Sequence, residues 1–149
     1  MQEMSTLEKL WSTGRLPIRD GLYTSSGDAY SVQISDMAPG GLEILEKFDL
    51  DSMVEADPDW LTSIDITREM EIDGGTCRLL AGEGSHGSEG FFARVDSCNN
   101  LKWVVYLEES NPFVDINISG NKAIFCSSSG VVIAVDIDRP ERGILESRI

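Results

Sequence analysis

The feature that most constrains the fold of this chain is an alternation of apolar and polar residues that runs through Phe91–Ile137. Side chains that alternate with a period of two lie on opposite faces of a β-strand, so the pattern predicts strands wherever it persists. It is clearest in Phe91–Val95 and Leu101–Leu107, which a short Asn-containing break separates. This spacing predicts a hairpin, and it places most of the available core residues in one sheet.

Three further segments follow this hairpin. Val114–Ser119 alternates in the same way, and a Gly-Asn turn signal separates it from the short apolar stretch Ala123–Cys126. Val131–Ile137 is almost continuously apolar, which is typical of a strand that is covered on both faces. We therefore expect this last segment in the interior of the sheet or beneath a helix.

The first half of the chain also predicts strands. Ala29–Ser35 alternates, and Ile64–Ile72 is joined to Thr76–Ala81 by Asp-Gly-Gly, a strong hairpin signal. Leu42–Leu50 fits a helical and an extended pattern about equally well. We interpret it as a strand because its neighbours are strands.

Two helix starts are visible. Ser5 with Glu8 forms a capping box, which predicts a short amphipathic helix from about Thr6 to Thr13. An Asp-Pro pair, with Asp57 in the N-cap position, predicts one helical turn over Pro58–Ser63. The acidic stretch before this pair is interpreted as a connection.

These elements predict a single domain, residues 1–149, of mainly β class, that is, a β-rich α+β fold. Seven to nine strands with short connections imply antiparallel pairing. We expect an antiparallel sheet curled into a sandwich or an open barrel, with the short N-terminal helix packed on it. The patterns leave open whether it is a sandwich or a barrel, and they do not indicate an oligomeric state.

The sequence also bears on location. It has no apolar run of about 18 residues, and its first residues lack the basic and apolar regions of a signal peptide. Cys77, Cys98 and Cys126 form no close pair, and an odd number of cysteines favours free thiols in a reducing compartment. We therefore expect a cytoplasmic protein that does not contact a membrane.

No catalytic or cofactor motif passes a check against its required context. Gly82–Gly87 matches G-x-G-x-x-G, but a dinucleotide site needs a helix next, and another strand is predicted there. His86, the only histidine, lies in this glycine-rich loop, where nothing fixes a catalytic base. The aspartates from Asp49 onward lack the glycine and glutamate of an EF-hand. We predict no catalytic, cofactor-binding or metal-binding residue.

Negative charge is the most unusual property of the composition. The chain carries a net charge of −14, and residues 21–75 alone account for −11. Such a field repels nucleic acid and anionic membranes and attracts basic proteins. The alternative is that the charge serves only solubility, but its concentration in one segment favours a binding role.

The acidic segment also contains an aromatic residue, Trp60. A tryptophan surrounded by carboxylates has the make-up of a binding surface for arginine and lysine. The alternative is a core tryptophan beside a solvated loop. The predicted partner-binding residues are Glu43, Glu46, Asp49, Asp51, Glu55, Asp57, Asp59 and Trp60.

In size, charge and class, the chain resembles the immunity proteins of bacterial contact-dependent and other polymorphic toxin systems. The resemblance implies a protein without enzymatic activity that binds a basic cognate toxin domain, often a nuclease, and blocks its active site or substrate surface.

Two alternatives remain. One is a small β-barrel enzyme or ligand-binding protein with a site near the Gly82–Gly90 loop, and the other is a nucleic-acid mimic that occupies a DNA-binding protein.

Overall fold

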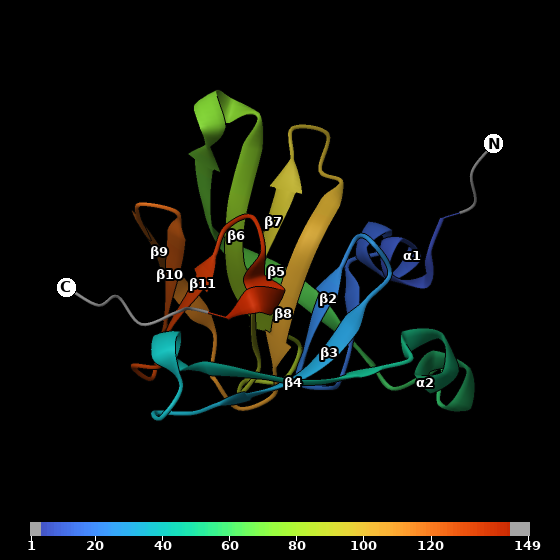
Figure 1. Ribbon diagram of the computed structural model, residues 1–149. Coiled ribbons are helices and arrows are strands. Elements are labelled where there is room, and N and C mark those ends of the chain that lie inside the picture. The colour runs from blue at the N-terminus through green and yellow to red at the C-terminus, as the bar shows by residue number, and fades with distance from the viewer. Residues whose placement is uncertain (1–3, 144–149) are drawn as a thin grey trace.

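The computed structural model describes residues 4–143, which form two antiparallel sheets and two short helices (Figure 1). The larger sheet has eight strands in the spatial order β1 (Arg15–Pro17), β5 (Leu61–Ile72), β6 (Cys77–Gly84), β7 (Gly90–Asp96), β8 (Leu101–Leu107), β2 (Gly21–Thr24), β3 (Ala29–Ile34) and β4 (Leu42–Phe48). The smaller sheet has three, in the order β11 (Val132–Asp136), β10 (Lys122–Ser127) and β9 (Phe113–Ser119).

The helices are α1 (Thr6–Ser12) and α2 (Leu50–Ala56), and single 3-10 turns occur at η1 (Pro39–Gly41), η2 (Asp73–Gly75) and η3 (Pro140–Arg142). The predicted capping box at α1 is present, since Ser5 and Glu8 each accept a hydrogen bond from the other's backbone N–H. No helix in the described part of the chain is long and apolar enough to cross a membrane.

The predicted fold class is confirmed. The protein is mainly β, its strands pair antiparallel, and a short N-terminal helix packs on the sheet. The larger sheet is open: its order begins at β1 and ends at β4 without closing. The smaller sheet covers one face of it, and α1 and α2 cover the other, so the arrangement is sandwich-like (Figure 1).

The core has two parts, one on each face of the larger sheet. Phe91 and Phe92 are neighbours on β7 and are both fully buried, but they belong to different clusters. Phe92 faces the smaller sheet, where its ring stacks on Phe125 with centroids 4.1 Å apart. Phe91 faces the helices and meets Trp11 of α1 edge to face.

The hairpin predictions are confirmed for β7–β8 and for β5–β6, which pair in antiparallel register around the Asp73–Gly75 turn. The segment Leu42–Leu50 is a strand, as interpreted, only as far as Phe48, since Asp49 caps α2 and Leu50 begins it. Strands β1 and β2 have three and four residues, too few for an alternation to show in the sequence.

Residues 50–63 differ from the prediction. The helix lies before Asp57, over Leu50–Ala56, and β5 begins at Leu61 without a helical turn ahead of it. Asp49 therefore caps the helix, and Asp57 follows its last turn. The physical reason is that Leu50, with Met53 and Val54 three and four residues later, can pack on the sheet only as one helical face.

Val131–Ile137 is also placed differently. Strand β11 lies at one end of the smaller sheet and not in an interior, and Val132 is 55% exposed. Continuous burial occurs instead in β8, where residues 103–107 are all buried. The alternation places Val104 and Tyr106 on the opposite face of β8 from Trp103 and Val105. Both side chains are buried there, in the part of the core that packs against the helices.

We predict that Phe92→Ala lowers the free energy of unfolding by about 3–5 kcal/mol, because it leaves a cavity between Phe113, Trp103 and Phe125. Urea denaturation measures the change. Ile66→Ala, at a residue that is 48% exposed on β5, is the control and should stay within about 0.5 kcal/mol of wild type. Equal effects at the two positions would contradict the two-sided core.

Candidate protein-binding surface

Helix α2 brings part of the predicted site together. Asp49 precedes it in extended conformation, and its carboxylate accepts a hydrogen bond of 3.1 Å from the backbone N–H of Ser52. This bond lowers the pKa of Asp49, as does the Ser52 hydroxyl. Asp49 thus has a structural role as the helix N-cap.

The helix is fastened to its surroundings by apolar and polar contacts. Leu50 is buried in the cluster on the helix side of the sheet. The guanidinium of Arg19 lies 3.7 Å from the centre of the Phe48 ring and also contacts the sulfur of Met53. The hydroxyl of Thr6 donates a hydrogen bond to the carboxylate of Asp51 and so links α1 to α2.

Trp60 is on the surface and not in the core. Its side chain is 55% exposed, and its indole N–H donates a 2.9 Å hydrogen bond to the backbone carbonyl of Ile18. The backbone N–H of Ile18 in turn donates to the carbonyl of Trp60 at 3.2 Å. The indole ring is therefore held in one orientation while about half of the residue surface remains exposed.

The carboxylates at the start of α2 have hydrogen-bond partners, whereas those at its end and after it have none among residues 4–143. Among the described residues, no side-chain hydrogen bond or ion pair holds Glu55, Asp57 or Asp59, and all three are exposed. Glu55 lies at the C-terminal end of α2, and Asp57 follows directly. The partial negative charge of a helix C-terminus makes anions unfavourable there.

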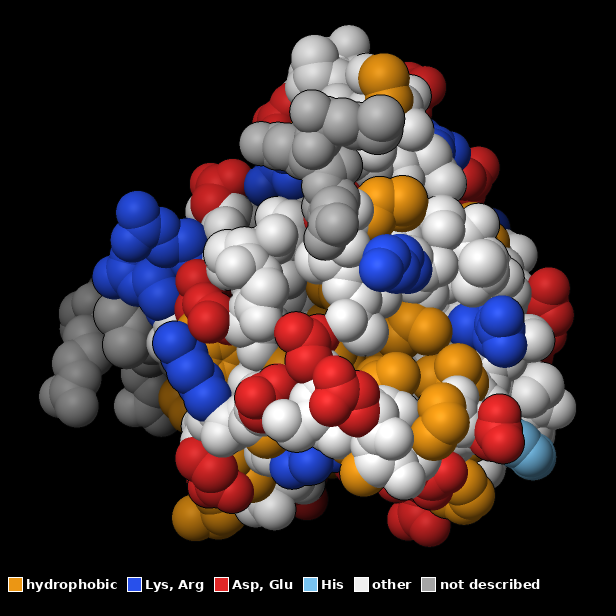
Figure 2. All heavy atoms as spheres, turned by 90° about the vertical axis from the view of Figure 1, so that its right-hand side faces the viewer, with side chains coloured by type: hydrophobic (Ala, Val, Ile, Leu, Met, Phe, Trp, Pro, Cys, Tyr) orange, Lys and Arg blue, Asp and Glu red, His pale blue; other side chains and the backbone are white. Residues whose placement is uncertain are grey.

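The eight predicted residues do not form one compact patch. Glu43 and Glu46 lie on β4, which crosses the bottom of the molecule in Figure 1 and leads to α2 at its far end. Of the other six, Asp49, Asp51 and Glu55 lie at the start of α2 or within it, and Asp57, Asp59 and Trp60 lie between α2 and β5. Figure 2 looks onto this side and shows carboxylates in its middle and along its lower edge, with hydrophobic side chains exposed beside them.

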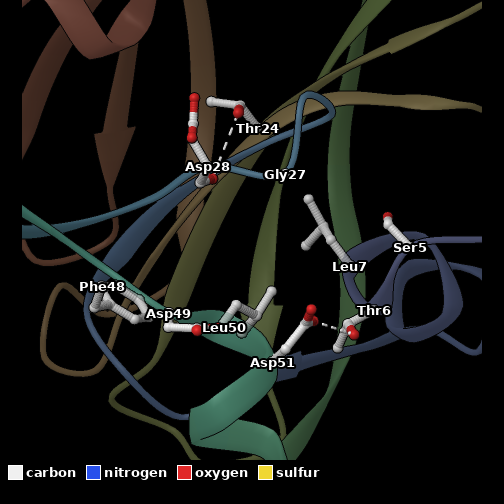
Figure 3. Close-up of a pocket in the computed structure, with 10 residues that line it drawn as sticks. All are labelled: Ser5, Thr6, Leu7, Thr24, Gly27, Asp28, Phe48, Asp49, Leu50 and Asp51. Carbon is white, nitrogen blue, oxygen red and sulfur yellow. Dashed lines mark hydrogen bonds between the residues drawn. The ribbon is translucent and has the colours of Figure 1, made fainter.

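A recess of about 310 Å³ lies between the start of α1, the β2–β3 turn and the start of α2 (Figure 3). Asp28, Asp49 and Asp51 line it. Each carboxylate already has a partner: Lys47 at 3.4 Å from Asp28, the cap contact for Asp49, and Thr6 for Asp51. The recess adds negative potential to the surface but offers no unsatisfied set of ligands.

A second group of carboxylates was not predicted. Burial raises the pKa of Asp20, against the hydrogen bond of 2.7 Å that it accepts from the backbone N–H of Glu108, and the charge of Glu109 raises it further. Burial and the charge of Asp20 likewise raise the pKa of Glu108. The two elements involved are 88 residues apart, so only the Glu108-Glu109 pair was visible in the sequence.

The loop between β6 and β7 contains a buried carboxylate that local sequence did not reveal. Glu89 is 2% exposed. It accepts hydrogen bonds from the Tyr106 hydroxyl, from Thr62 at 2.9 Å and from the backbone N–H of His86 at 2.9 Å. Burial alone would raise the pKa of Glu89, but these hydrogen bonds outweigh it and lower the pKa. Burial and the same contact raise the pKa of Tyr106.

These contacts do not assemble an acyl-transfer site. The Ser85 hydroxyl pairs with Thr62 at 2.8 Å, whereas Nδ1 of His86 lies 3.3 Å from Glu89, so in the described chain Ser85 and His86 do not bond to each other. The Gly82–Gly87 segment is followed by strand β7 and not by the helix that a dinucleotide site needs. Within residues 4–143, no three potential ligands are grouped as a metal site would require.

Comparison with known proteins adds no relative: no family model, no curated protein and no solved structure matches the chain.

We predict that Glu89→Gln makes the protein less stable at pH 7 by about 1–3 kcal/mol, because three donors lose a charged acceptor. Since folding lowers the pKa of Glu89 below its ordinary value of 4.5, its contribution is present above that pH and is lost as the pH falls through the lowered pKa.

The wild-type and Glu89→Gln stabilities should therefore converge on acidification, measured by urea denaturation from pH 7 to pH 3. Glu83→Gln, the same change at a partly exposed residue of β6, is the matched control and should leave the pH dependence unaltered. A constant difference between wild type and Glu89→Gln at all pH values would contradict this role.

Proposed function

We propose that the protein is an immunity protein, which binds a basic cognate toxin domain through its acidic surface and so neutralises it. A nuclease is the class of toxin that fits best, because nucleases present basic surfaces to their own substrate. Binding at that surface would block access of the nucleic acid.

One observation supports this proposal most strongly. Asp49 and Asp51 are at the N-terminal end of α2, where negative charge favours the helix, and both have partners. Glu55 and Asp57 are at the opposite end, where negative charge disfavours it, and no described residue compensates them. These two carboxylates lower the stability of the helix, and a role in binding a basic partner accounts for their presence.

The exposed Trp60 complements these charges. An oriented aromatic side chain buries a large area at little entropic cost, while rim carboxylates raise the association rate of a basic partner. The two parts of the surface affect binding differently. Removal of a carboxylate changes the salt dependence of association, and removal of the indole changes the dissociation rate.

The alternative of a β-barrel enzyme has less support. The larger sheet is open, so it has no barrel mouth in which a site could lie. In the Gly82–Gly90 loop, Glu89 accepts hydrogen bonds from Thr62 of β5 and Tyr106 of β8, which hold the loop to these strands, and a third from the backbone of His86 within the loop, which is a structural role.

A direct test is affinity measurement against the basic C-terminal domain of any large exported protein that a neighbouring gene encodes. Wild type should bind it tightly, and log Kd should rise linearly with log salt. A triple variant, Glu55→Gln with Asp57→Asn and Asp59→Asn, should bind more weakly and show a smaller salt dependence. The control triple removes three exposed carboxylates from β5 and β9, namely Asp65→Asn, Glu71→Gln and Asp115→Asn.

If wild type shows no salt-dependent complex with any such domain, the proposal is wrong. If both triple variants lose affinity equally, net charge alone is responsible and the acidic surface at α2 is not the binding site. Trp60→Ala should raise the dissociation rate about ten-fold or more without a change in the salt dependence.

The same surface predicts opposite effects on stability and on binding. Glu55→Lys places a favourable charge at the C-terminal end of α2 and should raise the free energy of unfolding by about 0.5 kcal/mol. It should also weaken the complex with the basic domain. Asp115→Lys on β9 makes the same change in net charge and should do neither; a destabilised Glu55→Lys variant would contradict the argument from the helix dipole.

A further inference from the structure

A second exposed surface lies at the other end of β4 from α2, where the β3–β4 hairpin turns. A groove of about 520 Å³ runs along this end. The hairpin lines it with Glu43 and with a group of apolar residues, namely Tyr30, Met37, Ala38, Pro39, Leu42, Ile44 and Leu45. Its remaining wall is formed by residues 141–143, at and after η3.

Met37 is the most exposed large apolar side chain of the described residues, at 92%. Leu45, in the same groove, is also exposed, and so is Ile34 in the strand that leads to the turn. Val132, at the start of β11, is also exposed. It lies beside the turn, since its carbonyl oxygen packs closely against Gly41. Exposed apolar residues that gather in one place mark interaction sites in monomeric proteins.

The turn that presents Met37 is well ordered by hydrogen bonds. The backbone N–H of Ser35 donates a hydrogen bond of 3.0 Å to the carbonyl oxygen of Gly41, and the backbone N–H of Ala38 donates one of 3.2 Å to the carbonyl oxygen of Ser35. Gly41 has a positive φ, and a Cβ there would lie 2.7 Å from the carbonyl oxygen of Val132. The turn is thus held against β11, and Met37 projects from a fixed support, which reduces the entropy that binding would cost.

The charged residues that line the groove sum to a net negative charge. Glu141 and Arg142 offset each other, and Lys47 is already 3.4 Å from Asp28. The remaining charge in the groove lining is the carboxylate of Glu43, and Asp36 and Glu46 are the sequence neighbours of Met37 and Leu45. A groove that combines exposed apolar side chains with a net negative charge fits a basic segment that carries an apolar side chain.

We infer that this groove is a second contact for the basic partner, which inserts an apolar side chain against Met37 and Leu45 while its Lys or Arg residues face Glu43 and Glu46. This inference rests on the proposed function, since it concerns the same partner. A second copy of the chain fits the groove less well, because two molecules of charge −14 would meet at carboxylate rims. Strand β4 joins the groove to α2, so one partner can contact both.

The test uses the same neighbouring basic domain as the probe. Met37→Ser and Leu45→Ser should each weaken its binding about ten-fold, and the salt dependence should stay as in wild type, because neither change alters charge. Ile66→Ser, a matched change at an exposed apolar residue of β5, should bind as wild type does. Circular dichroism on urea denaturation should show all three variants folded, since each side chain is at least partly exposed.

A second readout reports contact directly. The chain has five methionines, and labelling their methyl groups with ¹³C gives one NMR signal for each, with that of Met37 identified by its absence in Met37→Leu. The Met37 signal should shift on addition of the basic domain, and the signal of Met70, which packs against the core, should not.

The outcomes separate the two proposals. If wild type binds no basic domain, the function and the groove contact both fail. If wild type binds but Met37→Ser and Leu45→Ser bind equally well, only the groove contact is wrong. If light scattering shows a wild-type dimer that Met37→Ser dissociates, the groove joins two copies of this chain and the inference is overturned.

Discussion

The structure depends on one constraint, which is that the β7–β8 hairpin has large apolar side chains on both of its faces. Phe92 and Trp103 face one way, and Phe91 and Tyr106 face the other, and each is almost fully buried. Burial of this area is the main favourable term in folding, so both faces must be covered. The smaller sheet covers the first face, and α1 with α2 covers the second.

This requirement places the two proposed binding surfaces at the periphery. The centre of the larger sheet is covered on both faces, so side chains that a partner could contact lie on its edge strands and on the loops and helices next to them. Strand β4 is the last strand of the sheet, with the turn at Met37 before it and α2 after it. Its register shift, with Leu45 and Glu46 opposite Ser31 alone, interrupts the edge that would otherwise pair with another strand. Contact through side chains is therefore favoured over strand addition.

The sequence predicted the features that depend on neighbouring residues, such as the capping box at Ser5 and the hairpin turn at Asp73. It missed features set by distant residues. Strand β2 is ordered by pairing with β8, some 80 positions along the chain. Of the site, the exposure of Trp60 depends on Ile18, and the burial of Glu89 depends on Thr62 and Tyr106. None of these partners can be inferred from spacing, because each is brought close only by the sheet.

The eight residues of the predicted site are not equivalent once their partners are known. Asp49 and Asp51 stabilise the start of α2, so their presence is explained by folding alone. Glu55 follows them within the same seven-residue helix but has the charge that its position disfavours. A chain selected only for solubility can place negative charge anywhere on its surface, and the C-terminal end of a helix is then the least favourable choice. The charge at Glu55 is therefore the strongest argument for a basic partner.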